Sequence, residues 1–130
     1  MPKDAAERNR STDLGVVRIN NEAIMTIAAA AAMEVEGVHR LGGGIGTAFH
    51  EVLFRRTHFK GVSIRTREGE VKLSVSIVVE YGANIPRIAD EVQDGVKRTV
   101  EKMTGLILSA VDVVVEGVHA KLTNEKERKI

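Results

Sequence analysis

The sequence predicts an α+β fold: a two-layer sandwich in β-α-β-β-α-β order, with two helices packed on one face of a four-stranded sheet. Three observations support this prediction. Apolar residues recur at helical spacing over residues 22–35 and 85–103. Residues 71–79 alternate between apolar and polar side chains, as a half-buried strand requires. Glycines follow both helical segments, at Gly37 and Gly105, where helices commonly end.

The first strand and the first helix are expected near the N-terminus. Residues 16–19 are rich in β-branched side chains and predict a short strand. Asn20 or Asn21 is a suitable cap for the helix that follows, and Glu22 favours its N-terminal end. One apolar face runs along this helix, formed by Ile24, Ile27, Ala28, Ala31 and Val35.

Residues 41–61 interrupt the pattern. Three consecutive glycines and then Gly46 are incompatible with a regular element. Apolar residues further along, at Ala48, Val52 and Leu53, suggest one short helix ending near Arg55. We therefore interpret this segment as a mobile, glycine-rich insertion with an amphipathic centre.

The second half continues with a hairpin, a helix and a strand. Residues 62–67 and 71–79 read as two strands joined by a turn. Asn84 is a plausible N-cap, and Pro86 falls in the first turn of the second helix. The core-facing residues of that helix are expected to be Ile85, Ile88, Val92, Val96, Val100 and Met103. Residues 106–115 predict the last strand, and a split β-α-β arrangement is our first choice for the sheet.

Bulk properties indicate one domain. The 130 residues include no cysteine, and 19 basic against 18 acidic side chains give a net charge of +1. We expect a disordered tail over residues 1–13, a domain over 14–120 and a charged tail over 121–130. No apolar run reaches the roughly 18 residues of a membrane span, and no signal peptide is apparent. A cytoplasmic protein is expected, with membrane association through a partner.

Motifs for catalysis or cofactor binding are missing from the sequence. The glycines at 42–46 match neither the dinucleotide fingerprint nor the P-loop. No two histidines have the H-E-x-x-H spacing, and no G-x-S-x-G elbow occurs. The sequence Glu-Gly-Val-His occurs twice, ending at His39 and at His119. We interpret the two copies as the same type of turn at the ends of two elements. The sequence predicts no catalytic residue, no cofactor and no metal site.

The best local candidate for a binding site is a basic cluster in the insertion. It comprises Arg55, Arg56, His58 and Lys60, flanked by Phe54 and Phe59. Such a cluster can contact a protein partner or an anion, including phosphate. It also fits a helix C-terminus, where cations interact favourably with the helix dipole. Both interpretations remain open.

Several segments together resemble the alkaline-shock-protein family of general, envelope-related stress proteins of Gram-positive bacteria. The matching residues lie in Gly15–Ile19, Glu34–Val38, Val78–Gly82, Met103–Leu106 and Val111–Val113. The glycine insertion ending in Lys60-Gly61-Val62 is similar to one branch of the family. The resemblance implies a cytoplasmic, non-enzymatic protein that self-associates and is held near the membrane by a small membrane-anchored partner.

We therefore expect a non-enzymatic envelope-stress protein that acts as a scaffold through protein–protein contacts. A valine-rich sheet whose edges can pair with another chain supports this expectation. The alternative is a nucleic-acid-binding module that uses the basic insertion, although the near-neutral charge argues against it. A third reading, an enzyme acting on a small acidic substrate, needs a convergent polar pocket that the sequence does not display.

Overall fold

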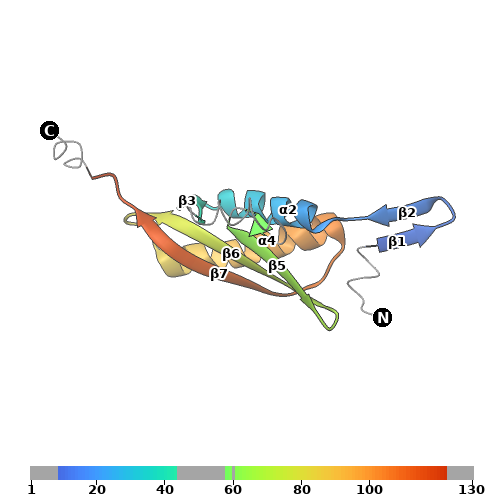
Figure 1. Cartoon of the computed structure of the whole chain (residues 1–130). Helices are drawn as coiled ribbons and strands as arrows, with labels where there is room; N and C mark the ends of the chain where they lie inside the picture. Colours follow the sequence, from blue (N-terminus) through green and yellow to red (C-terminus); the bar gives the residue numbers. More distant parts are fainter. Residues whose placement is uncertain (1–8, 44–57, 60, 123–130) are drawn as a thin grey trace.

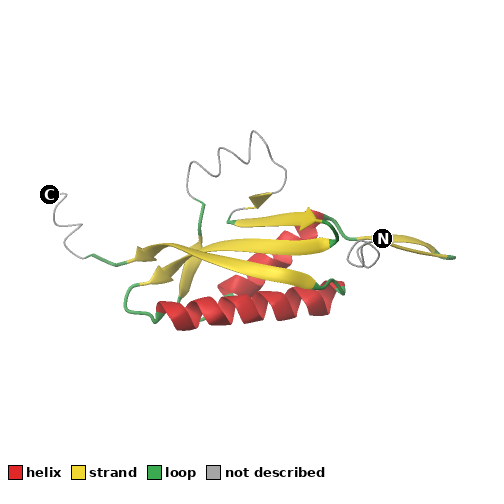
Figure 2. Ribbon diagram, turned by 90° about the horizontal axis from the view of Figure 1, so that it is seen from below, coloured by secondary structure: helices red, strands yellow, loops and turns green. Residues whose placement is uncertain are grey.

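A computed structural model of the chain describes residues 9–43, 58–59 and 61–122. Both helices lie on the same face of the main sheet (Figure 2). The predicted two-layer α+β class is confirmed. The elements are, in chain order, β1 (Asn9–Thr12), β2 (Gly15–Arg18), α2 (Asn21–Met33), β3 (Val38–Leu41), β4 (His58–Phe59), β5 (Val62–Arg67), β6 (Glu70–Glu80), α4 (Ile85–Thr104) and β7 (Leu108–His119).

Strand β6 organises the five-stranded sheet. Along one edge it pairs in parallel with β7, from Val71 opposite Leu108 to Glu80 opposite His119. Along the other edge it pairs antiparallel with β5 and then with β3, so these two short strands lie end to end. Ser76 marks the change of partner: its N–H donates to the carbonyl of Gly61, and its carbonyl accepts from the N–H of Gly42. Strand β4 extends the sheet beyond β5.

The split arrangement predicted for the sheet is wrong. Strands β6 and β7 are direct neighbours, with α4 as the crossover between them. The lengths explain this pairing. An 11-residue strand beside a 12-residue strand forms a long ladder, whereas the shorter β5 is held to the other edge of β6 by its hairpin turn.

The N-terminal region differs from the expected first strand of the sheet. Strand β2 pairs with β1 in a separate two-stranded hairpin (Figure 1). Its adjacent Val16 and Val17 point to opposite faces, so this strand has no single apolar side to bury. Strand β3 takes a place in the main sheet instead; it lies between the predicted first helix and the predicted insertion, where no strand is expected from the sequence.

The core lies between the helices and the sheet. The five β6 side chains predicted to face inward are fully buried: Val71, Leu73, Val75, Ile77 and Val79. Helix α4 covers them with Ile88, Val92, Val96 and Val100, as predicted. Ile85 and Met103 were also expected in the core, but they are 38% and 64% exposed because they lie in the first and last turns of the helix.

Helix α4 has clear end signals. The side chain of Asn84 accepts a hydrogen bond from the N–H of Arg87 at 3.1 Å, so the predicted cap is confirmed. Gly105 ends the helix in the left-handed conformation, with φ of 82°. Helix α2 starts after Asn20, whose side chain makes no capping bond.

Several predictions concern residues that the structure does not describe. Residues 1–8 and 123–130 of the expected tails are among them, whereas residues 9–12 form β1. The short helix expected between residues 48 and 55 also lies outside the described residues. In the part of the chain that is described, no helix is both long and apolar enough to cross a bilayer.

Candidate functional site

The two Glu-Gly-Val-His segments lie on either side of the C-terminal end of β6. One copy leads into β3 and the other lies within β7, and these strands flank β6 on its two edges. Val38 and Val118 both pair with Val79, from opposite sides. His39 and His119 follow those valines and therefore lie on either side of Glu80.

These three side chains form a close cluster, which we call the His39–Glu80–His119 cluster. Nδ1 of His39 lies 3.0 Å from one carboxylate oxygen of Glu80, and Nδ1 of His119 lies 3.3 Å from the other. The two imidazole rings stack with centroids 3.7 Å apart and planes inclined by 3°. Because an ionised carboxylate only accepts hydrogen bonds, both Nδ1 atoms donate to it.

The cluster is at the surface, and its electrostatics follow from its hydrogen bonds. The side chains of His39, Glu80 and His119 are 33%, 48% and 42% exposed. The hydrogen bonds from His39 and then His119 lower the pKa of Glu80 below its usual value of 4.5. Glu80 is thus held as a carboxylate between two imidazoles at neutral pH.

The cluster contains the donor types that bind transition metals. Among the described residues, it is the one group of at least three histidine, cysteine or acidic side chains whose donor atoms all lie within 4.8 Å. The sequence could not reveal this group by spacing, because 41 and 39 residues separate Glu80 from the two histidines. The repeated Glu-Gly-Val-His could have pointed to the cluster, but only if both copies had been assigned to strands that pair with β6.

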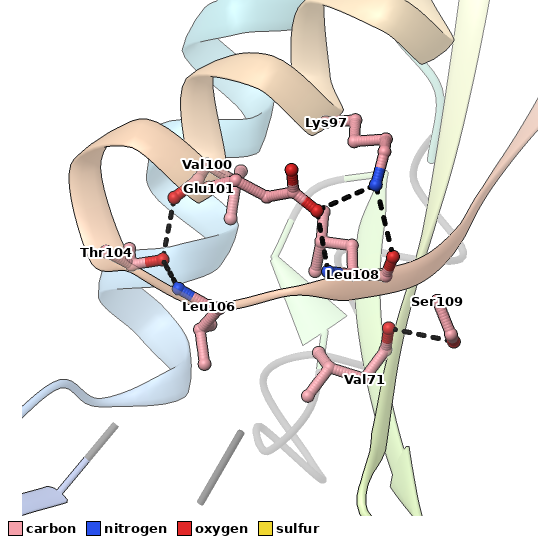
Figure 3. A network of polar contacts seen from close by, with 8 residues as sticks. All are labelled: Val71, Lys97, Val100, Glu101, Thr104, Leu106, Leu108 and Ser109. Atoms are coloured by element: carbon pink, nitrogen blue, oxygen red, sulfur yellow. Dashed lines mark hydrogen bonds and ion pairs between the residues drawn. The ribbon is translucent and has the colours of Figure 1, made fainter. Parts of the chain in front are cut away.

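A second polar network ties α4 to β7 (Figure 3). Glu101 accepts from Nζ of Lys97 at 2.7 Å and from the N–H of Leu108 at 2.8 Å. Burial raises the pKa of Glu101, but these two hydrogen bonds outweigh that effect and lower it below 4.5. Thr104 bridges the carbonyl of Val100 and the N–H of Leu106 at the same helix end. We interpret this network as structural, since it closes the turn between helix and strand.

The first glycines of the insertion serve a packing role. Gly42 is buried, and a Cβ at this position would lie 2.5 Å from a carboxylate oxygen of Glu116 and 2.9 Å from Cβ of Ser76. The N–H of Gly43 donates to the same carboxylate oxygen of Glu116 at 3.2 Å. The first glycine of the run therefore allows the end of β3 to pack closely against β6 and β7.

The structure describes only one of the four residues of the predicted basic cluster. The backbone of His58 lies in β4, paired with Ser63, whereas Arg55, Arg56 and Lys60 lie outside the described residues. The structure therefore does not test whether these four residues form a site. Their role in binding a partner or an anion stays a prediction, as does the nucleic-acid alternative that depends on them.

Comparisons with known proteins give a family match and several similar proteins. A family model described as alkaline shock protein 23, with a cell envelope-related function, matches residues 9–120. Two uncharacterised proteins of Bacillus subtilis (strain 168) are similar. YqhY is 33% identical over 110 residues, which cover 85% of this chain and 82% of YqhY. YloU is 31% identical over 115 residues, covering 87% and 94%.

A named relative and a solved structure extend the comparison. The stress response regulator gls24 homolog of Streptococcus pyogenes serotype M3 (strain MGAS315) is 27% identical over 127 residues, covering 93% of this chain and 71% of the relative. The solved structure titled MamM-CTD H285A aligns with a TM-score of 0.46 at 17% identity, covering 79% of this chain and 100% of that one. The match over residues 9–120, supported by these relatives, shows that the chain belongs to the alkaline shock protein 23 family.

Proposed function

We propose that the protein is a non-enzymatic scaffold of the envelope stress response, which acts by binding other proteins and further copies of itself. A small membrane-anchored partner would hold this scaffold near the membrane. The family's envelope-related description and the stress-response relative support the cellular setting. The proposed mode of action depends on one structural observation, the exposed N-terminal hairpin.

The β1–β2 hairpin projects from one end of the molecule (Figure 1). It carries exposed apolar side chains. Leu14 at its turn is 99% exposed, and Val16 and Val17 are 62% and 58% exposed. A two-stranded hairpin is at best marginally stable alone, and clustered exposed apolar residues mark interaction sites. Burial of the hairpin against another protein would stabilise it and would remove its apolar side chains from water.

The surface proposed to receive this hairpin is the groove between α2 and α4. It has a volume of about 310 Å³, and Ala31, Val35 and Gly95 contribute its apolar part. Acidic residues outnumber its one basic residue, Arg98; they are Glu34, Glu36, Glu91 and Asp94. The hairpin carries Arg10 and Arg18 against one acidic residue, Asp13, so its net positive charge is complementary to the net negative charge of the groove.

Two variants on separate surfaces test this contact. Leu14→Lys places a charge on the tip of the hairpin, and Gly95→Gln fills the groove with a residue that favours helix. We expect either change to weaken self-association by about tenfold or more, measured by analytical ultracentrifugation of the full chain.

The matched control is Tyr81→Ser. Tyr81 is another large exposed side chain, at 77%, but it follows β6 at the end of the molecule away from the hairpin. This variant should associate like the wild type. A wild-type protein that stays monomeric at millimolar concentration, and captures no membrane protein from cross-linked cells, would contradict the proposed function.

A further inference from the structure

We propose that the His39–Glu80–His119 cluster binds one first-row divalent transition-metal ion, of the Zn²⁺, Co²⁺ or Ni²⁺ class. This inference is independent of self-association through the hairpin. It combines three features of the cluster: the spacing of its donor atoms, the backbone that positions them and the chemistry of the donors.

Each histidine donor atom lies close to ligand spacing from one oxygen of the Glu80 carboxylate, and the donor atoms of the three residues all lie within 4.8 Å of one another. Imidazole nitrogens and carboxylate oxygens bind Zn²⁺ at about 2.0–2.2 Å, so neighbouring ligands of one tetrahedral ion lie roughly 3.3–3.6 Å apart. The distances from Nδ1 of His39 and Nδ1 of His119 to the Glu80 carboxylate are 3.0 and 3.3 Å. One ion can bind there when the proton of each imidazole moves from Nδ1 to Nε2, because both Nδ1 atoms then offer a lone pair to the ion while Glu80 stays a carboxylate.

Backbone hydrogen bonds between the strands fix the positions of the three residues relative to one another. The N–H of Glu80 donates to the carbonyl of Gly37 at 2.9 Å, two residues before His39. The N–H of Tyr81 donates to the carbonyl of His119 at 3.0 Å. The three donors thus stand on three strands of one hydrogen-bonded sheet. Rigid placement of this kind lowers the entropy lost when an ion is bound.

The side chains have the freedom that metal binding needs. Parallel rings direct their in-plane lone pairs along parallel lines, so the stacked imidazoles must tilt apart to share one ion. Their side chains are 33% and 42% exposed, and this tilt does not require movement of the buried core. The interaction between the stacked rings is weak compared with two metal–nitrogen bonds.

The donor set selects the class of ion. Two imidazoles and one carboxylate suit zinc, cobalt and nickel, whereas calcium and magnesium prefer oxygen ligands alone. Three protein ligands leave at least one coordination position for water or for a donor from another molecule. Binding at this end of the sheet would also link β3 and β7 across β6.

The test uses Co²⁺ as the probe with the full-length protein. Visible d–d absorption should report one Co²⁺ per chain, and Zn²⁺ should displace it. The variants His39→Gln, Glu80→Gln and His119→Gln should each weaken binding by about tenfold or more. The control variant His50→Gln/His58→Gln removes the two other histidines of the chain and should bind Co²⁺ as the wild type does.

Circular dichroism of each variant confirms that it is folded before titration. Because none of the three side chains is buried, the substitutions should leave the spectrum unchanged. The proposal is overturned if the wild type shows no d–d band, if any one of the three single variants binds as tightly as the wild type, or if the control variant loses the band.

Discussion

Two glycines of the helical layer have opposite surroundings. Gly37 has φ of 105°, and a Cβ there would lie 2.5 Å from Cδ1 of the buried Ile88. Gly95 lies inside α4, and no described atom comes within 4 Å of the position that its Cβ would take. The first glycine is needed for the backbone and for the core, whereas the second weakens its helix and lines the groove between α2 and α4.

Alanine at these two positions should therefore change stability in opposite directions. Gly37→Ala combines an unfavourable φ with a clash against Ile88, and we expect it to lower the free energy of unfolding by about 1–3 kcal/mol. Gly95→Ala should raise it by about 0.5–1 kcal/mol, because alanine favours helix and meets no neighbour. Urea denaturation at low protein concentration measures both. Equal effects of the two substitutions would contradict this account.

Glu101 is the residue whose ionisation should affect stability most clearly. Its side chain is 26% exposed and its folded pKa lies below 4.5. A lowered pKa means that the stabilisation is fully present above pH 4.5 and is lost as the pH falls through the folded value. Glu101→Gln should cost about 1 kcal/mol at pH 7, and the difference from wild type should shrink below pH 4.5.

Asp94→Asn is the control for this prediction. Asp94 pairs with Arg98 on the same helix, but the two side chains are 71% and 67% exposed. Its loss should cost at most about 0.5 kcal/mol. Denaturation curves collected from pH 3 to pH 7 compare the three proteins. A constant difference between wild type and Glu101→Gln over that range would show that ionisation of Glu101 does not matter.

The candidate site shows the limit of prediction from single residues. The sequence displayed the repeated Glu-Gly-Val-His but not that Glu80 stands between the two copies. That relation depends on β3 and β7 pairing with opposite edges of β6. Strand partners are set by tertiary packing, which side-chain spacing along the chain does not encode.

At the scale of elements, prediction succeeded where one face of an element is buried. Strand β6 and helix α4 bury a regular set of side chains, so their periodicity is visible in the sequence. Strands β1 and β3 have four residues each, too few to establish a period. The parallel neighbour of β6 was also missed, because alternation identifies a buried face but not the strand beside it.

The two helix starts differ in a way that mutation can measure. Asn84 caps α4 through its hydrogen bond with the N–H of Arg87, whereas Asn20 precedes α2 without a capping bond. Asn84→Ala should lower the free energy of unfolding by about 1 kcal/mol. Asn20→Ala, the matched control, should have a clearly smaller effect. The comparison fails if thermal or urea unfolding gives the same loss for both.

At the scale of the whole molecule, the proposed contact joins two different surfaces. The hairpin of one copy would enter the groove between α2 and α4 of the next, leaving a free hairpin and a free groove on the pair. A contact between unlike surfaces closes into a ring or continues as an open chain, depending on the rotation between copies. Either outcome would give a scaffold from a single domain, with the His39–Glu80–His119 cluster at the end away from the hairpin.

This geometry predicts that two defective variants can complement each other. Leu14→Lys keeps an intact groove, and Gly95→Gln keeps an intact hairpin, so each should be monomeric alone. An equal mixture should form a dimer and stop there, because only one productive contact remains between the two. Sedimentation velocity of the separate proteins and of the mixture distinguishes these states. If the mixture stays monomeric, or if Gly95→Gln alone assembles like the wild type, hairpins contact a surface other than the groove.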